Sequence, residues 1–203
     1  MKKISGITIN GLKNNKLTKK IPEFYELKKV IENSDWHNKS HVFNHTISVL
    51  KNMERLFGEY DKKLSKYLGK KLNKYSRKEL LFLSALLHDI SKTETLVKKR
   101  NITYFPGHEF KGAVKAGKIL KRFDLTPKEQ KFVIRLVKYH GLGHQMPKMG
   151  QSAYEKFRNS RKDIFLELVL LVMADMLGSH LKTNRPKDFG VRLKFYKRIL
   201  SKY

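Results

Sequence analysis

The sequence predicts an all-α domain with one small β-hairpin near residues 94–105. Apolar residues recur at helical spacing along most of the chain, as in residues 40–57. Residues 94–105 break that spacing with β-branched and aromatic residues around a turn-like Lys-Arg-Asn. The length of 203 residues suits one domain, and neither an internal repeat nor an interior linker interrupts the pattern.

The first twenty residues mix glycine, asparagine and lysine, and we expect a basic N-terminal arm, extended or a frayed strand, before a domain at 21–203. Pro22 suits a first helical turn and opens a short amphipathic segment at 23–31. The later helices are expected at 40–57, 77–90, 108–123, 127–139, 152–159, 163–179 and 188–200, with a lysine-rich helix or helical loop at 61–72.

Local signals justify the ends of these helices. Ser40, Ser76 and Thr126 are the expected N-caps, and Pro127 suits a first helical position. Gly141 is expected to end the helix that begins at Pro127. The helix after Ser76 is apolar nearly all round, so it should be buried.

The charge is strongly positive. Lys+Arg 45 against Asp+Glu 18 gives a formal net charge of +27, concentrated in residues 13–20, 62–78, 98–100 and 185–202. Such a surface attracts polyanions, so we expect a nucleotide or RNA substrate. An alternative is a genome that drifts toward lysine codons, although the resulting field would still favour anions.

Other features narrow the class of protein. The longest apolar stretch, 164–177, contains Glu167 and Asp175 and is shorter than the about 20 residues of a membrane span. The first residues lack the apolar core of a signal peptide. Without cysteine, disulfides and thiolate metal sites are excluded. We therefore expect a cytoplasmic protein without a membrane partner.

Histidines and aspartates within apolar, helix-like segments are the strongest functional signal. Burying such groups is unfavourable unless something compensates them, and a shared metal ion would do so for all of them. Imidazoles and carboxylates suit Mn, Ni, Co, Fe or Zn, as one ion or two. The candidate metal ligands are His45, His88, Asp89, Asp175, His108 and His140.

Some of these residues also have simpler interpretations. His88 and Asp89 end a buried helix, where they could interact with the helix dipole or cap it. Asp175 could pair with a core arginine, although none lies on the same face nearby. His140 could be an ordinary helix C-cap. Lys92 lies four residues after His88, on the same helical face, where it could meet a phosphate oxygen.

Further residues are candidates for contact with the substrate. His41 lies one expected turn before His45 and could join it on an ion, or be a satisfied core histidine. His37 and His144 are placed in loops, near the site at most. The candidate catalytic residues are Asp89, Lys92 and His108, and the candidate substrate-binding residues are Lys92, His41, His144 and Arg100.

The series His45, His88-Asp89 and Asp175 resembles the pattern of the HD-domain metal-dependent phosphohydrolases. The similarity is closer to the HD domain attached to bacterial CCA-adding enzymes (tRNA nucleotidyltransferases) and poly(A) polymerases. It covers roughly residues 21–182. The matching blocks are 21–27, 36–46, 85–95, 105–113, 136–140 and 174–179.

The resemblance implies an HD-type helical bundle in which His45, His88, Asp89 and Asp175 hold a first ion. His108 and His140 would bind a second ion or the phosphate, and Lys92 would face the phosphate. The related domains are implied to cleave phosphomonoesters and 2′,3′-cyclic phosphodiesters of nucleotides or RNA ends.

This chain departs from the family pattern at two positions, Ser91 in place of glycine and His41 in place of an acidic or small residue. His41 could be an extra ligand or a substrate contact. No nucleotidyltransferase domain fits in the first twenty residues, so we expect a stand-alone domain that does not add nucleotides.

The hypothesis is a metal-dependent phosphatase or phosphodiesterase acting on RNA ends or nucleotides. One alternative is a small-nucleotide hydrolase: a 5′-nucleotidase, a dinucleoside polyphosphate hydrolase or a cyclic (oligo)nucleotide phosphodiesterase. Another is a non-catalytic basic module that binds nucleic acid.

Overall fold

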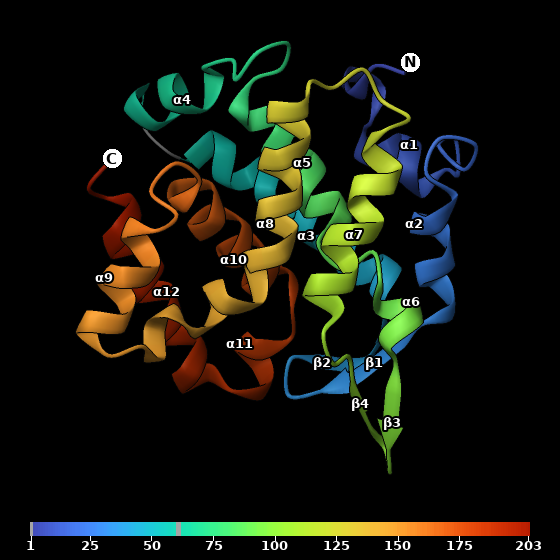
Figure 1. Cartoon of the computed structure of the whole chain (residues 1–203). Helices are drawn as coiled ribbons and strands as arrows, with labels where there is room; N and C mark the ends of the chain where they lie inside the picture. The colour runs from blue at the N-terminus through green and yellow to red at the C-terminus, as the bar shows by residue number, and fades with distance from the viewer. Residues whose placement is uncertain (1, 60–61) are drawn as a thin grey trace.

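The computed structural model describes residues 2–59 and 62–203, and it confirms a predominantly helical domain (Figure 1). Residue 61, where one expected helix begins, lies outside the described residues. The α-helices are α1 (Ile9–Lys13), α2 (Pro22–Glu26), α3 (Val42–Glu59), α4 (Lys62–Gly69), α5 (Arg77–Leu87), α6 (Lys92–Thr95), α7 (His108–Leu120), α8 (Pro127–Gln145), α9 (Gln151–Asn159), α10 (Phe165–Gly178), α11 (Leu181–Asn184) and α12 (Pro186–Leu200).

Helix α10 is the centre of the bundle. It packs along α3 and also contacts α8, α5 and α12, so its residues from Phe165 to Met176 are all buried. This burial follows from the sequence, which is apolar on every face except at Glu167 and Asp175. Among the described residues, no helix is both long and apolar enough to cross a membrane.

Helices α5 and α8 lie side by side and begin at the same end of the bundle (Figure 1). The expected caps Ser76 and Thr126 are confirmed, and each forms a reciprocal capping box with a glutamate three residues later, Glu79 and Glu129. Glu129 also accepts a hydrogen bond of 2.8 Å from the backbone N–H of Tyr75. The starts of the two helices are thereby tied together.

Helix α8 continues further than the sequence indicates. Gly141 does not end it, and the helix runs to Gln145, which places His144 in the helix and not in a loop. Gly143 is required for packing: a Cβ atom there would lie 2.6 Å from Cγ1 of Val172 on α10. Gly143 therefore marks a close approach of α8 to α10.

The expected hairpin is confirmed, with β3 (Val97–Lys99) antiparallel to β4 (Ile102–Tyr104), although residues 94 and 95 belong to α6. The structure also has a second hairpin that the sequence analysis missed, β1 (Ile31–Ser34) with β2 (His37–His41). Ser40 lies in β2 and is not the N-cap of α3, which begins at Val42.

The two hairpins contact each other. The backbone N–H of Asn33 on β1 donates a hydrogen bond of 2.8 Å to Oγ1 of Thr103 on β4. Together the hairpins form the lower part of Figure 1, beside α6. This contact fixes the position of the turn between β1 and β2, which carries Trp36.

Residues 2–20 do not form an extended arm. They form a 3₁₀-helix, η1 (Ile4–Gly6), and α1, which Thr8 caps by accepting from the N–H of Gly11 at 3.1 Å. Leu12 and Leu17 are buried in the core. A boundary at residue 20 between an arm and a domain stays a prediction.

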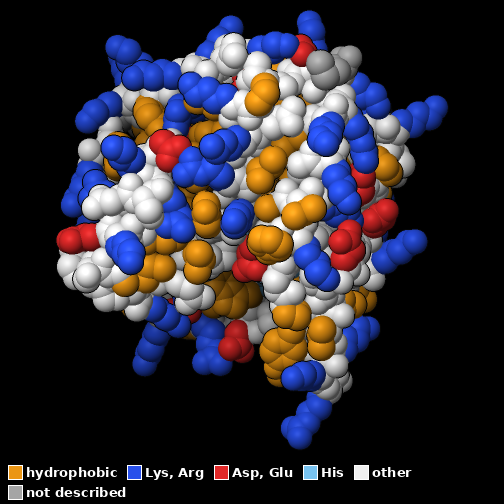
Figure 2. Space-filling view, in the orientation of Figure 1, with side chains coloured by type: hydrophobic (Ala, Val, Ile, Leu, Met, Phe, Trp, Pro, Cys, Tyr) orange, Lys and Arg blue, Asp and Glu red, His pale blue; other side chains and the backbone are white. Residues whose placement is uncertain are grey.

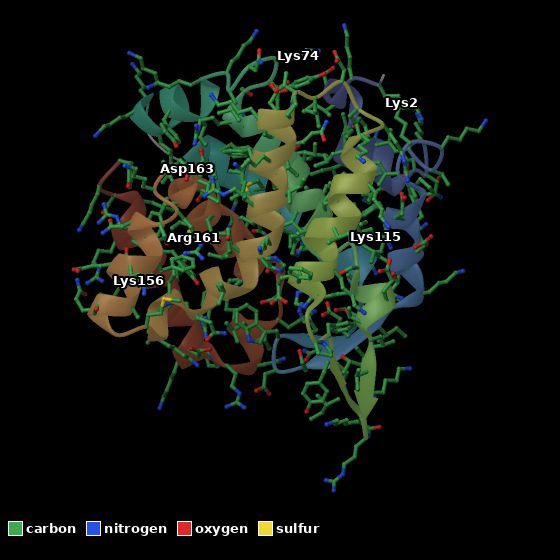
Figure 3. The ribbon with its side chains drawn as sticks, viewed as in Figure 1. Lys2, Lys74, Lys115, Lys156, Arg161 and Asp163 are labelled. Carbon is green, nitrogen blue, oxygen red and sulfur yellow. The ribbon has the colours of Figure 1, made fainter. Side chains whose placement is uncertain are left out.

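The start of the chain is also bonded to the end of α7. Lys2 donates its N–H to the carbonyl of Arg122 at 3.1 Å and accepts from the N–H of Asp124 at 2.9 Å (Figure 3). Within α7, Nζ of Lys115 lies 2.7 Å from Oε1 of Glu94 on α6. These contacts hold α7 against its neighbours.

Candidate metal centre

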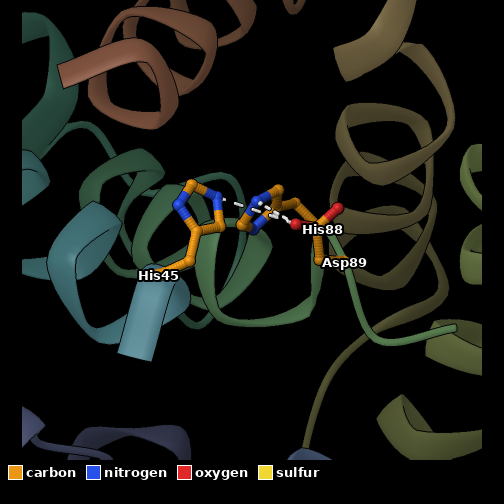
Figure 4. Close-up of side chains that lie close together, drawn as sticks. All are labelled: His45, His88 and Asp89. Atoms are coloured by element: carbon orange, nitrogen blue, oxygen red, sulfur yellow. Dashed lines mark ion pairs between the residues drawn. The ribbon is translucent and has the colours of Figure 1, made fainter. Parts of the chain in front are cut away.

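One group of candidate ligands gathers where α5 ends. His88 and Asp89 follow α5, and His45 comes from the buried face of α3 (Figure 4). Asp175 comes from α10. Nε2 of His45 lies 3.0 Å from Oδ1 of Asp175 and 3.7 Å from Oδ2 of Asp89. Nε2 of His88 lies 3.1 Å from Oδ2 of Asp89. The packing of α3, α5 and α10 therefore brings four polar side chains together.

A second group adjoins the first through Asp89. Its other oxygen, Oδ1, lies 3.4 Å from Nε2 of His108, at the start of α7, and 3.7 Å from Nε2 of His140, on α8. The ligand atoms of His45, His88 and Asp89 could hold one ion, and those of Asp89, His108 and His140 another. Asp89 thus belongs to both groups.

Three of the imidazoles have their tautomer fixed by the backbone. Each Nδ1 lies within hydrogen-bond distance of a carbonyl oxygen three residues earlier, and because a carbonyl only accepts, Nδ1 must carry the proton. In the neutral imidazole, Nε2 then carries the lone pair that a metal ligand requires. The pairs are His88 with Ala85 (2.7 Å), His108 with Phe105 (2.8 Å) and His140 with Val137 (2.7 Å).

These atoms fit a cation. Nε2 of His108 and Nε2 of His140 are 3.3 Å apart, and both present lone pairs, so neither can donate to the other. Nε2 of His88 is buried and also lacks a hydrogen-bond partner among the described residues. Buried polar atoms without partners are unfavourable, and a divalent ion would satisfy all three. Nitrogen and carboxylate ligands suit a transition metal ion.

The carboxylates remain ionised. Burial alone would raise the pKa of Asp89, but His88 and Lys92 outweigh it and hold the pKa well below its usual range. Burial likewise opposes ionisation of Asp175, and hydrogen bonding to His144 outweighs it, so that pKa is also well below its usual range. Two buried negative charges therefore favour a cation here.

The imidazoles respond to these charges in opposite ways. Burial would lower the pKa of His88, but the adjacent Asp89 outweighs it and raises the pKa to about 9, so a metal ion that binds Nε2 would displace a proton from it. Burial, followed by repulsion from His108, lowers the pKa of His140 to about 3. His140 is therefore neutral at pH 7, the state in which an imidazole binds a metal.

A cleft of about 320 Å³ exposes one side of this site to solvent. Aromatic and cationic side chains supply much of the wall beyond the candidate ligands. The lining residues are Trp36, His37, Asp89, Lys92, His108, Glu109, His140, Gly141, His144, Gln145, Lys148, Asp175 and Arg192. An anionic substrate can therefore reach Asp89 and His108 together.

Lys92 lies in the cleft wall but is engaged with carboxylates. Its Nζ is 2.7 Å from Oδ2 of Asp89 and 2.6 Å from Oε1 of Glu32 on β1. Burial would lower the pKa of Lys92, but these carboxylates outweigh it and raise the pKa. Lys92 is therefore a buried cation shared by two carboxylates, and its contact with a phosphate stays a prediction.

His144 lies beside the first group, one helical turn after His140. Its Nε2 is 2.8 Å from Oδ2 of Asp175, so Nε2–H donates a hydrogen bond to that carboxylate. The carbonyl of His144 accepts a hydrogen bond of 2.7 Å from Arg192 on α12. His144 thus orients Asp175, and its contact with a substrate stays a prediction.

His41 and Arg100 lie outside the cleft lining. His41 is the last residue of β2 and does not sit one helical turn before His45, contrary to expectation. The histidine of β2 that packs against His45 is His37, with the two ring centroids 4.5 Å apart. Arg100 is exposed between β3 and β4. Substrate contacts by His41 and Arg100 stay predictions.

Three residues of the cleft region are not among the predicted site residues: Trp36, Glu32 and Arg192. Trp36 is the only tryptophan of the chain, a signal that could have pointed to it. Glu32 pairs with Lys92 across 60 residues, and Arg192 reaches the carbonyl of His144 from the C-terminal helix. Nothing local in the sequence indicates either contact.

The fold and the site define a helical protein with a histidine and aspartate centre suited to divalent metal. The HD domain model matches residues 42–178, well over half of the chain, so the chain belongs to the HD-domain family. HD domains bind divalent metals and form a superfamily of metal-dependent phosphohydrolases. Comparison with curated proteins gave no match. Trp36 and Arg192 lie outside the matched segment.

Proposed function

We propose that this protein hydrolyses phosphomonoester or 2′,3′-cyclic phosphodiester bonds of RNA ends or nucleotides. The observation that carries the proposal is the pair of ligand groups that share Asp89 at the base of an open cleft. The net charge of +27 supports an RNA substrate. The resemblance to the HD domain of CCA-adding enzymes points in the same direction. A cytoplasmic location, where such substrates occur, is part of the proposal.

The roles of the residues follow from their positions. His45, His88, Asp89 and Asp175 would hold a first ion, and Asp89, His108 and His140 a second. A bound divalent ion supplies Lewis acidity to a phosphoryl oxygen and to water. The shared carboxylate of Asp89 would orient the attacking water in line with phosphorus.

The remaining groups keep this arrangement in place. Lys92 balances the charges of Asp89 and Glu32, and it lies close enough to the cleft to stabilise charge on a phosphate. His108 is less buried than His88, so it is the imidazole best placed to meet the substrate. His144 holds Asp175 through a hydrogen bond of 2.8 Å.

A small-nucleotide hydrolase is the second candidate. The cleft volume of about 320 Å³ favours it, since it lies near the lower end of the range for small-molecule sites. Such an enzyme would act on mononucleotides, dinucleoside polyphosphates or cyclic (oligo)nucleotides and would use the same residues.

The test is a metal analysis of purified protein, followed by turnover assays with Mn, Ni, Co and Mg. Phosphomonoesters, 2′,3′-cyclic phosphates, mononucleotides and RNA oligomers are compared at two salt concentrations. Turnover of RNA that falls steeply with salt supports the first proposal, because RNA binding releases counterions. Salt-insensitive turnover of mononucleotides alone supports the second. Nucleic-acid binding that survives chelation, without hydrolysis of any phosphoester, refutes both and identifies a binding module.

A further inference from the structure

Large apolar side chains are exposed on the outer surface of α7 and α8. Phe110 and Val114, one turn apart on α7, are 63% and 52% exposed, and Leu142 on α8 is 46% exposed. Figure 2 shows hydrophobic side chains over these two helices, among lysine and arginine side chains. A grouped apolar surface on a chain of such high charge indicates an interaction site.

This surface is hollowed next to the metal centre. Phe110, Lys138, Tyr139 and Leu142 line a depression of about 320 Å³. The other residues that line it also line the cleft of the metal centre. These shared residues are Glu109, Gly141 and Gln145. The depression and the cleft therefore adjoin, so one extended ligand can contact both.

The depression combines an open aromatic ring with a cation. Nζ of Lys138 lies 5.6 Å from the ring centroid of Phe110 and 5.7 Å from that of Tyr139. Arg161 covers the Tyr139 ring, with its guanidinium carbon 4.1 Å from the centroid (Figure 3). Phe110 is 63% exposed, so most of its side chain is accessible to a ligand.

We infer that Phe110 and Lys138 bind a nucleotide of single-stranded RNA next to the phosphate that lies at the metal centre. Exposed rings stack with nucleobases, and a neighbouring cation contacts the backbone phosphate. The positive charge of the chain complements such a ligand. The inference rests on the proposed function and specifies its substrate as single-stranded polynucleotide.

Glu109 separates the depression from the metal centre. Its Oε2 lies 3.4 Å from Nδ1 of His108. A carboxylate repels a phosphate but accepts hydrogen bonds from the amino group of a base. The base would therefore face Glu109 and Phe110, and the phosphate would face Lys138.

The test measures binding of a fluorescently labelled single-stranded oligoribonucleotide by anisotropy, with chelator present so that no turnover occurs. Phe110→Leu keeps an apolar side chain but removes the ring, whereas Phe110→Tyr keeps the ring. We expect roughly tenfold weaker binding by Phe110→Leu and near-normal binding by Phe110→Tyr. Equal affinities of Phe110→Leu and the parent protein would overturn the inference.

Lys138 gives an independent measurement. Lys138→Ala should lower the slope of log affinity against log salt by about one. Lys118→Ala is the matched control, because Lys118 is also exposed but lies near the other end of α7 and does not line the depression. The same change of slope in both variants would show a diffuse charge effect and count against a site at Lys138.

Hydrolysis separates this inference from the proposed function. Phe110→Leu should hydrolyse p-nitrophenyl phosphate at the parent rate, because this substrate carries no nucleobase and Phe110 does not line the cleft. If the parent hydrolyses no phosphoester but Phe110→Leu still weakens RNA binding, the function fails and the RNA site stands. If hydrolysis proceeds and RNA binding is unchanged, the site fails alone.

The same surface could instead pair two copies of the chain. Sedimentation of the parent and of Phe110→Leu decides between these occupants. A monomeric parent supports the RNA site. A parent dimer that Phe110→Leu dissociates, with RNA binding unchanged, would overturn the inference and identify a self-association surface.

Discussion

The buried polar groups at the two ends of α5 and α8 differ in their hydrogen bonding. At the end where the helices begin, Glu129 accepts hydrogen bonds from backbone N–H groups of Tyr75 and Thr126, and its helix is capped by a reciprocal box. At the other end, Nε2 of His88 has no hydrogen-bond partner in the described part of the chain, and Nε2 of His140 faces Nε2 of His108 at 3.3 Å. One pair of parallel helices thus carries a satisfied network and an unsatisfied one.

The difference separates stability from function within the same helices. Satisfied buried carboxylates stabilise the fold, whereas converging lone pairs need a ligand from outside the chain. Substitutions at the capped end should therefore change unfolding but not metal binding. Those at the cleft end should change metal binding and activity with little effect on the fold.

The largest effect is expected at Asp89, which both ligand groups share. Asp89→Ala should reduce metal-dependent hydrolysis by about 1,000-fold or more, because loss of a bound ion removes several kcal/mol of transition-state stabilisation. Circular dichroism should show an intact helical fold. Asp163→Ala, which removes a surface carboxylate paired with Arg135, is the control. Retained turnover by Asp89→Ala would refute the assignment.

Replacing one histidine from each group tests whether the two groups are separate. His88→Gln should lose the ion held by the more buried group, and His140→Gln should retain that ion and lose the more exposed one. Metal content per chain, measured by mass spectrometry, should fall by one ion in each variant relative to the parent. The rise in melting temperature on adding metal should disappear in His88→Gln and persist in His140→Gln. Loss of all bound metal in both variants would contradict two distinct groups.

His144 should have an intermediate effect, since it acts through Asp175. Loss of a hydrogen-bond partner of a metal ligand typically costs about 10–100-fold in metal affinity or activity. His144→Ala should show this loss, and His144→Gln, which can still donate to Asp175, should recover part of it. His180→Ala is the control, because His180 is an exposed histidine outside the cleft lining. Parent-like metal affinity in His144→Ala would exclude this role.

The smallest functional effect and a clear stability effect are expected at Glu129. Burial would raise the pKa of Glu129, but the backbone N–H groups of Thr126 and Tyr75 outweigh it and lower the pKa below 4.5. The ionised group therefore contributes stability at neutral pH that is lost as pH falls below 4.5. Glu129→Gln should lower the free energy of unfolding by about 2 kcal/mol at pH 7 and by less in acid.

Urea titrations at several pH values measure this difference. Metal content of Glu129→Gln should equal that of the parent, since Glu129 lies at the end of α8 away from the cleft. Glu59→Gln, which removes an exposed i, i+4 pair with Arg55, is the control and should change stability little. A pH-independent difference for Glu129→Gln would show that ionisation of Glu129 does not contribute.

Much of the fold was predictable because periodicity and caps are local signals. Ser76 and Thr126 cap the helices expected after them, and the hairpin at 97–104 follows from its β-branched residues. The approach of His45, His88 and Asp89 was also indicated, because each interrupts an apolar segment and a common ion explains all three.

The errors arose where tertiary contacts override local signals. Gly141 suggested a helix end, but neighbouring helices hold α8 in place through Gly141 and Gly143. The first twenty residues lack a clear hydrophobic period, yet Leu12 is buried in the core, and this burial stabilises α1. The β1–β2 hairpin depends on its contact with β4, about seventy residues away. Such contacts cannot be inferred from neighbouring residues.

Gly143 makes the site sensitive to the smallest possible enlargement of a side chain. A methyl group at this position would meet Val172 at 2.6 Å and would act as a wedge between α8 and α10. Because His140 and His144 flank it on one helix and Asp175 lies on the other, the wedge would widen the spacing on which coordination depends. By contrast, a methyl group at Gly141 would meet only the flexible end of Glu109. Two glycines separated by one residue should therefore tolerate replacement very differently.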